Sequence, residues 1–349
     1  MSARGQRQEY VPATAGLVGD IAVETRELGE GEELRARGYW EQVWRRLRRD
    51  RAAIVSGVFI LLLVFAAFAG APIAAALLGH GPNDLLRGGT DPTTFTPVGP
   101  FSHVSTGPGH ETLLVLGASD SLGRDELLRL LYGAQVSLEV AVLATLIGVV
   151  TGVGLGLVAG FYGGLVDMLV SRMTDIVMAF PLLLFAVALA STVGDRINSV
   201  TLGGVFAPGV VTLVIVIGAF SWFYPARIIR AQVLSLREKE FIEAARSFGA
   251  GDIRLMRSHI LPHLVAPIIV YSTLIVAANV LFEAGLSYLG LGLPLPNASW
   301  GNLLSSATNF YLAQPWLMLW PGLAILLTTL AFNLLGDGLR DAFDPRAST

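Results

Sequence analysis

The chain has 349 residues, of which 53% are hydrophobic and only 15% are charged, whereas soluble domains are about 25% charged. The apolar residues are gathered in long uncharged runs, such as 52–78, 140–166 and 284–336, and about 20 such residues suffice for a transmembrane helix. A soluble globular enzyme is the poorer fit, and the sequence predicts an integral membrane protein. The formal net charge of −3 decides little, because the distribution of arginine and lysine matters more than their sum.

Two features that the sequence lacks limit the chemistry that the chain can perform. The chain has no cysteine, which excludes disulfide, thiolate-nucleophile and zinc-thiolate chemistry. Its single lysine, Lys239, lies between Glu238 and Glu240, so the Gly-Lys-Ser/Thr of a Walker A loop is missing. The chain therefore does not bind ATP by that route.

The N-terminal region divides into two segments. Residues 1–33 are polar, rich in glycine and without periodicity, which predicts a disordered cytoplasmic tail. Segment 34–51 carries apolar residues at helical spacing, namely Trp40, Val43, Trp44 and Leu47. With arginines on the rest of the helix surface, this pattern predicts a basic amphipathic interfacial helix. The alternative is a positive stop before the first span, on the same cytoplasmic side. About 50 polar residues precede the first apolar run, so we expect a retained anchor rather than a cleaved signal peptide.

Six membrane spans are predicted from the apolar runs. They are Ala52–Leu78, Val136–Gly160, Ile176–Thr192, Gly209–Phe223, Val265–Phe282 and Trp316–Gly336. We expect the first span to be followed by an external loop over 79–133, and the other five to form a core over 134–337. The proline-broken, uncharged stretch 286–315 is expected to lie against or re-enter the outer leaflet. Residues 338–349 are predicted to be a cytoplasmic tail.

The basic residues predict the orientation of the chain. With the N-terminus inside, the cytoplasmic segments hold 20 of the 24 arginine and lysine residues, and only Arg87, Arg124, Arg129 and Arg196 lie outside. The inverted topology would place seven cations in one short external loop, against the positive-inside bias. Both termini are therefore expected in the cytoplasm.

Glycines recur along the second span. Gly148, Gly152, Gly156 and Gly160, and Gly164 just beyond, have a four-residue spacing that places them on one helical face. Small residues at this spacing allow another helix to approach closely in lipid. A dinucleotide-binding loop is the competing interpretation, but the glycines do not match G-x-G-x-x-G and follow no strand. The pattern indicates helix packing.

The segment 225–264 between the fourth and fifth spans is long, basic and twice helical in pattern. Ser235 to Glu238 has the Ser-x-x-Glu form of a capping box, and Gly249 is expected to end the helix in a left-handed conformation. The helix between them has an apolar face at i, i+3, i+4 and i+7, formed by Phe241, Ala244, Ala245 and Phe248.

Asp252 is expected to cap a second short helix that bears Ile253, Met256 and Ile260, and Pro262 is expected to end it. The apolar face of the first helix has no evident partner in this chain. The pattern therefore favours docking into a groove on another protein, and the alternative is an inert connecting loop.

Four stretches carry a family resemblance. Glu243-Ala244-Ala245, Gly249 and His259-Ile260-Leu261-Pro262 resemble the EAA loop of membrane subunits of binding-protein-dependent ABC importers, although His259 stands where that pattern usually has an aliphatic residue. The other stretches are Gly123 to Leu138, Glu283 to Gly292 and Gly336 to Arg346. Over about residues 40–346 the chain resembles the C-type permease subunit of dipeptide, oligopeptide or nickel importers.

The resemblance implies an all-α membrane protein with six transmembrane helices and the type I ABC importer permease fold. It implies a partner permease that is homologous to this chain, two ATPase subunits that bind ATP and Mg, an extracytoplasmic solute-binding protein, and a bacterial inner membrane location. The chain itself would hold no cofactor and would not be an enzyme. The implied cargo is short peptides, with nickel complexes or oligosaccharides as alternatives. The residues that the resemblance assigns to ATPase coupling are Phe241, Glu243, Ala244, Ala245, Phe248, Gly249, Ile260 and Pro262.

Two polar residues of the fifth span are candidates for the solute path. Glu283 follows 19 uncharged residues, and Asn279 lies one turn earlier on the same face. An ionisable group near membrane depth is a functional hypothesis. The alternative is a hydrogen bond between helices or to Ser287. Glu139, Asp175 and Asp337 lie at the ends of predicted spans and are expected to be interfacial or paired with cations.

The histidines of the chain give little support to an enzymatic function. His259 and His263 are four residues apart, but Pro262 intervenes and no acidic partner accompanies them as in H-E-x-x-H. His103 and His110 of the external loop could meet a nickel cargo, but solvated loop histidines are commoner. A secondary transporter driven by ions would need inverted repeats and midplane charges, which the sequence lacks. A membrane enzyme or a scaffold is the remaining rival.

Overall fold

The computed structural model describes residues 39–107 and 110–344. The chain divides into two units, Met1–Val43 and Trp44–Thr349. Of the first unit only residues 39–43 are described, and they begin helix α2 (Tyr39–Leu47). The predicted tail 1–33 lies outside the described residues. The other elements named below belong to the second unit.

The first span is one continuous helical run that begins at a capped residue. It comprises α3 (Arg51–Phe65), the π-helix η1 (Ala66–Gly70) and α4 (Ala71–Leu78). The Asp50 carboxylate caps α3, because its Oδ1 accepts hydrogen bonds from the backbone N–H of Ala52 at 2.8 Å and of Ala53 at 3.2 Å. The interfacial helix predicted over 34–51 therefore ends at Leu47, and a separate helix begins four residues later.

The connection after α4 contains a β-hairpin, which the sequence did not predict. Strands β1 (Ser102–Gly107) and β2 (His110–Leu114) pair antiparallel, with Ser102 opposite Leu114. The next helix, α5 (Glu126–Tyr162), has 37 residues and begins within the predicted external loop 79–133. Its start is fixed by Asp125, whose side chain accepts a hydrogen bond from the N–H of Leu128.

The predicted third span is wrong as a single helix. Helices α6 (Gly164–Ala179) and α7 (Leu182–Ile197) meet at an angle of 89°. The break lies at Phe180 and Pro181, where Phe180 has extended angles of φ −91° and ψ 142°. Proline disfavours a helical conformation in the residue before it and has no N–H to donate, so the helix ends there.

The predicted fourth span continues well past Phe223. It is made of α8 (Val210–Ser221) and α9 (Phe223–Leu236), which together are long and apolar enough to cross a membrane. Ser235 thus lies inside α9 and does not cap a helix. The helix continues because Ile229 and Val233 are buried and α9 packs along α5.

The predicted fifth span begins earlier than Val265. Short helix α10 (Glu240–Ser247) precedes α11 (Asp252–Arg254), the π-helix η2 (Leu255–Ile260), α12 (Leu261–Leu286) and the π-helix η3 (Ser287–Leu291). Pro262 does not end the helix, because it occupies the first turn of α12 directly after η2. A π-bulge accommodates the backbone hydrogen bond that proline cannot make.

The C-terminal part consists of α13 (Trp300–Ala307) and α14 (Trp316–Phe343). Helix α13 lies in the proline-broken stretch expected to approach the outer leaflet, and it packs on α12 and α14. The predicted tail 338–349 is helical up to Phe343.

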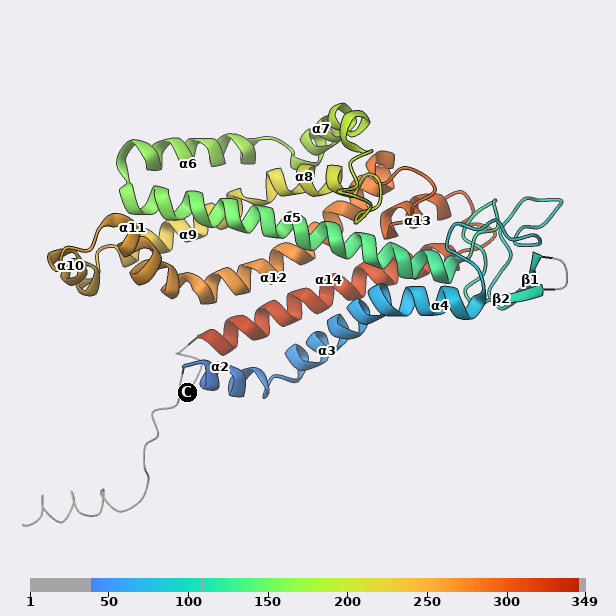
Figure 1. Ribbon diagram of the computed structural model, residues 1–349, viewed down its shortest axis with the longest axis horizontal. Helices are drawn as coiled ribbons and strands as arrows, with labels where there is room; N and C mark the ends of the chain where they lie inside the picture. Colours follow the sequence, from blue (N-terminus) through green and yellow to red (C-terminus); the bar gives the residue numbers. More distant parts are fainter. Residues whose placement is uncertain (1–38, 108–109, 345–349) are drawn as a thin grey trace, which may run out of the picture. The chain divides into compact units, whose positions relative to one another are not determined.

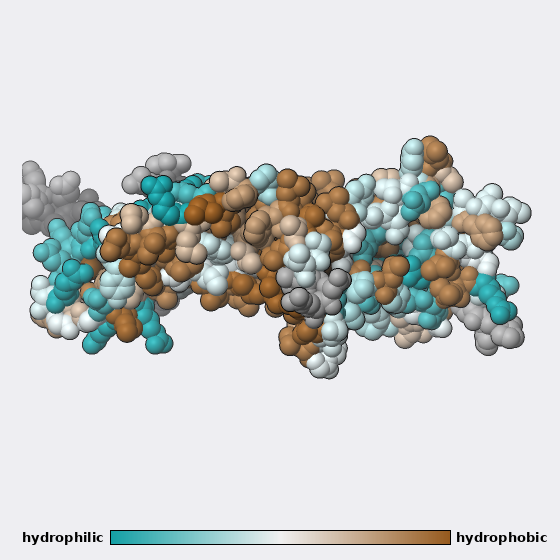
Figure 2. All heavy atoms as spheres, turned by 90° about the horizontal axis from the view of Figure 1, so that it is seen from above, coloured by the Kyte–Doolittle hydropathy of each residue, from teal (hydrophilic) through white to brown (hydrophobic). Residues whose placement is uncertain are grey.

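Within the second unit the long helices run side by side (Figure 1). Helix α5 contacts α8, α9 and α12, while α14 contacts α3 and α12. The β-hairpin and α10 lie at opposite ends of these helices (Figure 1). Hydrophobic residues gather across the middle of the face shown in Figure 2, and hydrophilic residues lie towards its two ends.

The described residues contain five helices long and apolar enough to cross a membrane, or six when the bent pair α6 and α7 counts as one span. Many large apolar side chains on them are exposed, for example Leu61 at 70% and Leu184 at 66%. Exposed apolar surface of this extent is typical of helices in contact with lipid or with partner subunits. The predicted helical membrane fold is confirmed, with the third span bent.

Candidate functional site

The glycines predicted for packing line the contact between α5 and α8–α9. A Cβ on Gly152 would lie 2.8 Å from Cβ of Pro225, and one on Gly156 would lie 2.5 Å from the carbonyl oxygen of Ala226. Gly148 and Gly160 similarly face Ser221 and Val233. Each glycine therefore allows the facing helix to approach within backbone contact.

Gly164 does not belong to this face, contrary to the four-residue pattern. Helix α5 ends at Tyr162, and Gly163 and Gly164 both have positive φ, of +67° and +53°. No atom lies within 4 Å of a Cβ built on Gly164. The chain turns at these two glycines, so the helical spacing does not extend to the second of them.

The buried residue of helix α10 is Ile242, which the predicted face omitted. Ile242 is 1% exposed and packs with Val233, Leu255, Ile260 and Leu264. Phe248, in contrast, is 92% exposed. The residue spacing alone allows two apolar faces on an eight-residue helix. Ile242, an apolar residue directly after Phe241, could have indicated the second face.

The remaining predicted coupling residues lie around this helix. Glu243 and Ala244 are exposed, Ala245 is half-buried and Phe241 is 40% exposed. Gly249 has a φ of +83°, which confirms the predicted left-handed end of the helix. The predicted capping residue Asp252 is instead the first residue of α11, and Gly251 occupies the N-cap position.

The surface around α10 carries exposed apolar side chains. Phe241, Phe248 and, on α11, Ile253 at 76% exposure present large apolar groups at the end of the unit opposite the β-hairpin. Ile260 is fully buried and anchors the segment from inside, whereas Pro262 is exposed in the first turn of α12. We call Phe241, Phe248 and Ile253 the apolar tip.

Glu283 and Asn279 are buried polar residues of α12 that connect helices. The Glu283 carboxylate is 0% exposed and accepts hydrogen bonds from Ser137 Oγ at 2.8 Å and Ser287 Oγ at 2.6 Å. Ser299 is a third hydroxyl partner. This geometry favours the alternative role of Glu283 as a hydrogen-bonded link between α5, α12 and η3, because the carboxylate is already enclosed by its own chain.

Asn279 has a second feature besides its hydrogen bonds. Its Nδ2 donates to Thr145 Oγ1 at 2.9 Å, and its Oδ1 accepts from Ser221 Oγ at 3.1 Å. It also lines a largely apolar cavity of about 300 Å³ between α8–α9 and α12, with Tyr224 and Tyr271. Asn279 thus remains a candidate for contact with a solute, whereas Glu283 does not line this cavity.

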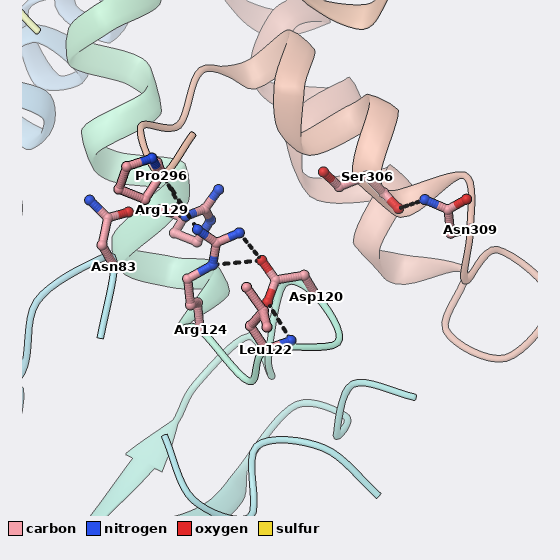
Figure 3. A network of polar contacts seen from close by, with 8 residues as sticks. All are labelled: Asn83, Asp120, Leu122, Arg124, Arg129, Pro296, Ser306 and Asn309. Atoms are coloured by element: carbon pink, nitrogen blue, oxygen red, sulfur yellow. Dashed lines mark hydrogen bonds and ion pairs between the residues drawn. The ribbon is translucent and has the colours of Figure 1, made fainter. Parts of the chain in front are cut away.

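A buried polar network, which the sequence did not predict, lies at the hairpin end of α5 (Figure 3). Arg124 donates through Nε to Asp120 Oδ2 at 2.7 Å and through Nη1 to the carbonyl oxygen of Pro296 at 3.4 Å. Arg129 donates through Nη1 to the same carbonyl and to Asn83 Oδ1, both at 3.1 Å. The network connects the start of α5 to segments more than 40 and 160 residues away.

A second buried pair reinforces this end of α5. Nε2 of His80 lies 3.0 Å from Oδ2 of Asp125, and both side chains are almost fully buried. The sequence counted Arg124 and Arg129 among the external cations, and the structure adds that both are buried in the protein. The stretch Gly123-Arg124-Asp125, which carries part of the family resemblance, could have indicated these buried charges. Nothing in its spacing shows what the charges contact.

The structure also shows where the other charged and histidine candidates from the sequence lie. Asp175 pairs with Arg227 at 2.9 Å, as expected for an end-of-span residue, and the His263 ring lies 5.2 Å from that of Phe241. His103 lies on exposed β1. Within the described residues no group of three or more histidine, aspartate or glutamate side chains is placed to hold a metal ion.

Comparison with known proteins identifies the family. Residues 152–349 match the model of the binding-protein-dependent transport system inner membrane component, and residues 38–88 match the N-terminal TM domain of oligopeptide transport permease C.

Relatives match over nearly their whole length. The chain is 35% identical to a glutathione transport system permease protein of Pectobacterium atrosepticum over 88% of this chain and 91% of the relative. It is 35% identical to a dipeptide transport system permease protein of Alkalihalophilus pseudofirmus over 88% and 90%. It is 36% identical to a putative peptide transport system permease protein of Brucella abortus over 86% and 90%. The chain therefore belongs to the family of binding-protein-dependent transport system inner membrane components, which confirms its resemblance to the C-type permeases of ABC importers.

Proposed function

We propose that this chain is the permease of a peptide importer and forms half of the translocation pathway together with a second, homologous permease. The observation that carries the proposal is the match, over 86 to 88% of the chain, to permeases of glutathione, dipeptide and putative peptide transport systems. The cavity beside Asn279, which opens between α8–α9 and α12, supports a solute path on this side of the unit.

The energy for transport would come from two ATPase subunits that bind ATP and Mg, and cargo would be delivered by an extracytoplasmic solute-binding protein. The chain itself would need no cofactor, because its role is to move helices. An apolar side chain contributes about 1.5–3 kcal/mol when it is fully buried. The apolar tip of Phe241, Phe248 and Ile253 would therefore gain most by entering a cleft on an ATPase subunit.

In this proposal α10 acts as a coupling helix. Ile242 packs it firmly against α9, η2 and α12, so a displacement of the apolar tip would be transmitted to the spans. An exposed ion pair contributes only about 0–1 kcal/mol, which is why the proposal assigns the docking energy to the apolar residues rather than to Arg246.

The test is substitution of Phe248. Because Phe248 is 92% exposed, Phe248→Asp is expected to leave the fold intact, lower peptide uptake by about tenfold or more and uncouple ATP hydrolysis from transport. Ala245→Asp is expected to act in the same direction, but Ala245 packs on the cluster of Ile242, so its effect would include a loss of stability.

The matched control is Arg246→Ala on the same helix. Uptake and ATPase rate are measured in the reconstituted transporter, with thermal unfolding as the check on folding. If Phe248→Asp and Arg246→Ala had equal, negligible effects on uptake and on ATPase rate, the coupling role would be wrong.

A further inference from the structure

A small polar cavity near the hairpin end of α5 is not used by the proposed coupling mechanism. Its volume is about 130 Å³, and its lining includes the polar residues Asn83, Tyr132, Gln135, Glu139 and Asn297. Most ligand pockets have volumes of about 300–1,000 Å³. This cavity therefore fits one end group of a ligand rather than a whole peptide.

Among the described residues that line the cavity, Glu139 is the only charged one, and none of them supplies a cation to it. Gln135 donates through Nε2 to Oε1 of Glu139 at 3.2 Å. Among the described side chains, which do not include those of residues 106–110 and 193–196, no ion pair to this carboxylate and no hydrogen bond to its second oxygen is found. The sequence expected Glu139 to be interfacial or salt-bridged at the end of a span, but it lies within α5 and is half-buried.

The neighbouring network does not supply the missing positive charge. Asn83, which lines the cavity, accepts a hydrogen bond at Oδ1 from Nη1 of Arg129 at 3.1 Å. Arg124 is paired with Asp120, and the other hydrogen bond of Arg129 goes to the carbonyl oxygen of Pro296. Among the described side chains neither arginine forms an ion pair with Glu139, so this carboxylate is free to attract a cation from elsewhere.

We propose that this cavity binds a cationic end group of the cargo, namely the α-ammonium group of a peptide. Glu139 would pair with the ammonium group, and the side-chain oxygens of Gln135 and Asn297 and the hydroxyl of Tyr132 would accept its remaining hydrogen bonds. Charge-assisted hydrogen bonds are about twice as strong as neutral ones, so a half-buried carboxylate would select strongly for a free amine. This inference rests on the proposed function, because it assumes a peptide cargo.

The experiment uses the complete transporter reconstituted with its binding protein. Uptake of a mixed panel of di- and tripeptides is compared with uptake of the same peptides after N-acetylation, which removes the positive charge. The wild-type protein should prefer the free peptides, and Glu139→Gln should raise KM for them by about tenfold while leaving KM for the acetylated peptides unchanged. Glu139→Asp, which keeps the charge, should retain part of the preference.

The matched control is Glu111→Gln, which removes an exposed carboxylate on β2 and should change neither KM. Thermal unfolding of each variant verifies that it is folded. Peptide uptake that is as fast and as selective in Glu139→Gln as in wild type would overturn the inference and leave the proposed function standing. A wild-type transporter that imports none of the peptides would overturn both.

A preference that follows a lysine side chain instead of the N-terminus would place a different ammonium group in the cavity. It would overturn the assignment to the α-ammonium group. Lysine-containing peptides that are acetylated at the N-terminus distinguish the two ammonium groups, because only the lysine side chain of such a peptide keeps its positive charge.

Discussion

At the scale of single residues, the hairpin end of the protein is stabilised by charges that are hidden from solvent. Arg124 and Asp120 form an ion pair whose side chains are 7% and 11% exposed. Such a pair costs free energy to bury, but removing one partner costs more, because the other charge is then left alone. The network therefore makes the start of α5 depend on residues that the sequence placed in the external loop 79–133.

Substitution of Asp120 tests this dependence. Asp120→Ala leaves the Arg124 guanidinium with only the distant Pro296 carbonyl, so the free energy of unfolding should fall by about 3–5 kcal/mol. Thermal unfolding in detergent measures the loss. The double variant Asp120→Ala/Arg124→Leu should recover most of it, and Glu111→Ala is the exposed control. A single variant as stable as the control would show that the pair contributes nothing.

At the scale of elements, the contact between α5 and α8–α9 depends on four glycines. Gly156→Ala would place a methyl group 2.5 Å from the carbonyl oxygen of Ala226, so the two helices must separate. We expect a loss of stability of about 1–3 kcal/mol from overpacking and a matching fall in uptake.

Gly154 supplies the control on the same helix. No atom lies within 4 Å of a Cβ built there, so Gly154→Ala should be neutral or stabilising by about 0.5–1 kcal/mol. Thermal unfolding of both variants in detergent decides the matter. If Gly154→Ala were as harmful as Gly156→Ala, the glycines would matter for helix flexibility rather than for packing.

How far the sequence predicts these elements depends on the kind of signal. Uncharged runs located the spans, because hydropathy is local, and the glycine spacing located the contact face of α5. The bend at Phe180 and Pro181 could have been predicted, because proline carries a local signal. The end of α9 could not, because Ser235 offers a plausible cap and only the packing of Val233 in the folded protein overrides it.

The site residues likewise divide into those that a local sequence signal predicts and those that depend on distant contacts. Gly249 was predicted correctly from its local conformation, but the buried anchor Ile242 was not, since an eight-residue helix carries two apolar faces. The roles of Arg124, Arg129 and Glu283 depend on partners that are up to 172 residues away. Contacts over such separations leave no trace in periodicity.

At the scale of the whole molecule, the distribution of basic residues predicts which end faces the cytoplasm. The α10 end carries most of the loop arginines, so it should lie inside and the β-hairpin end outside. Because the chain has no cysteine, single cysteines can be introduced without background.

In intact cells a membrane-impermeant maleimide should label Thr94→Cys in the exposed hairpin-end loop and should leave Ser247→Cys on α10 unlabelled. Both positions are exposed, so accessibility within the protein does not bias the result. Permeabilised cells serve as the control, in which both variants should react. The opposite labelling pattern would invert the predicted topology.

The most direct measurement is peptide accumulation in proteoliposomes of defined composition. The account predicts that liposomes with the permease pair, both ATPase subunits, the binding protein and ATP accumulate peptide, and that omission of the ATPase subunits or of ATP abolishes accumulation. Liposomes that contain only this chain and concentrate peptide at the full rate without nucleotide would contradict the account.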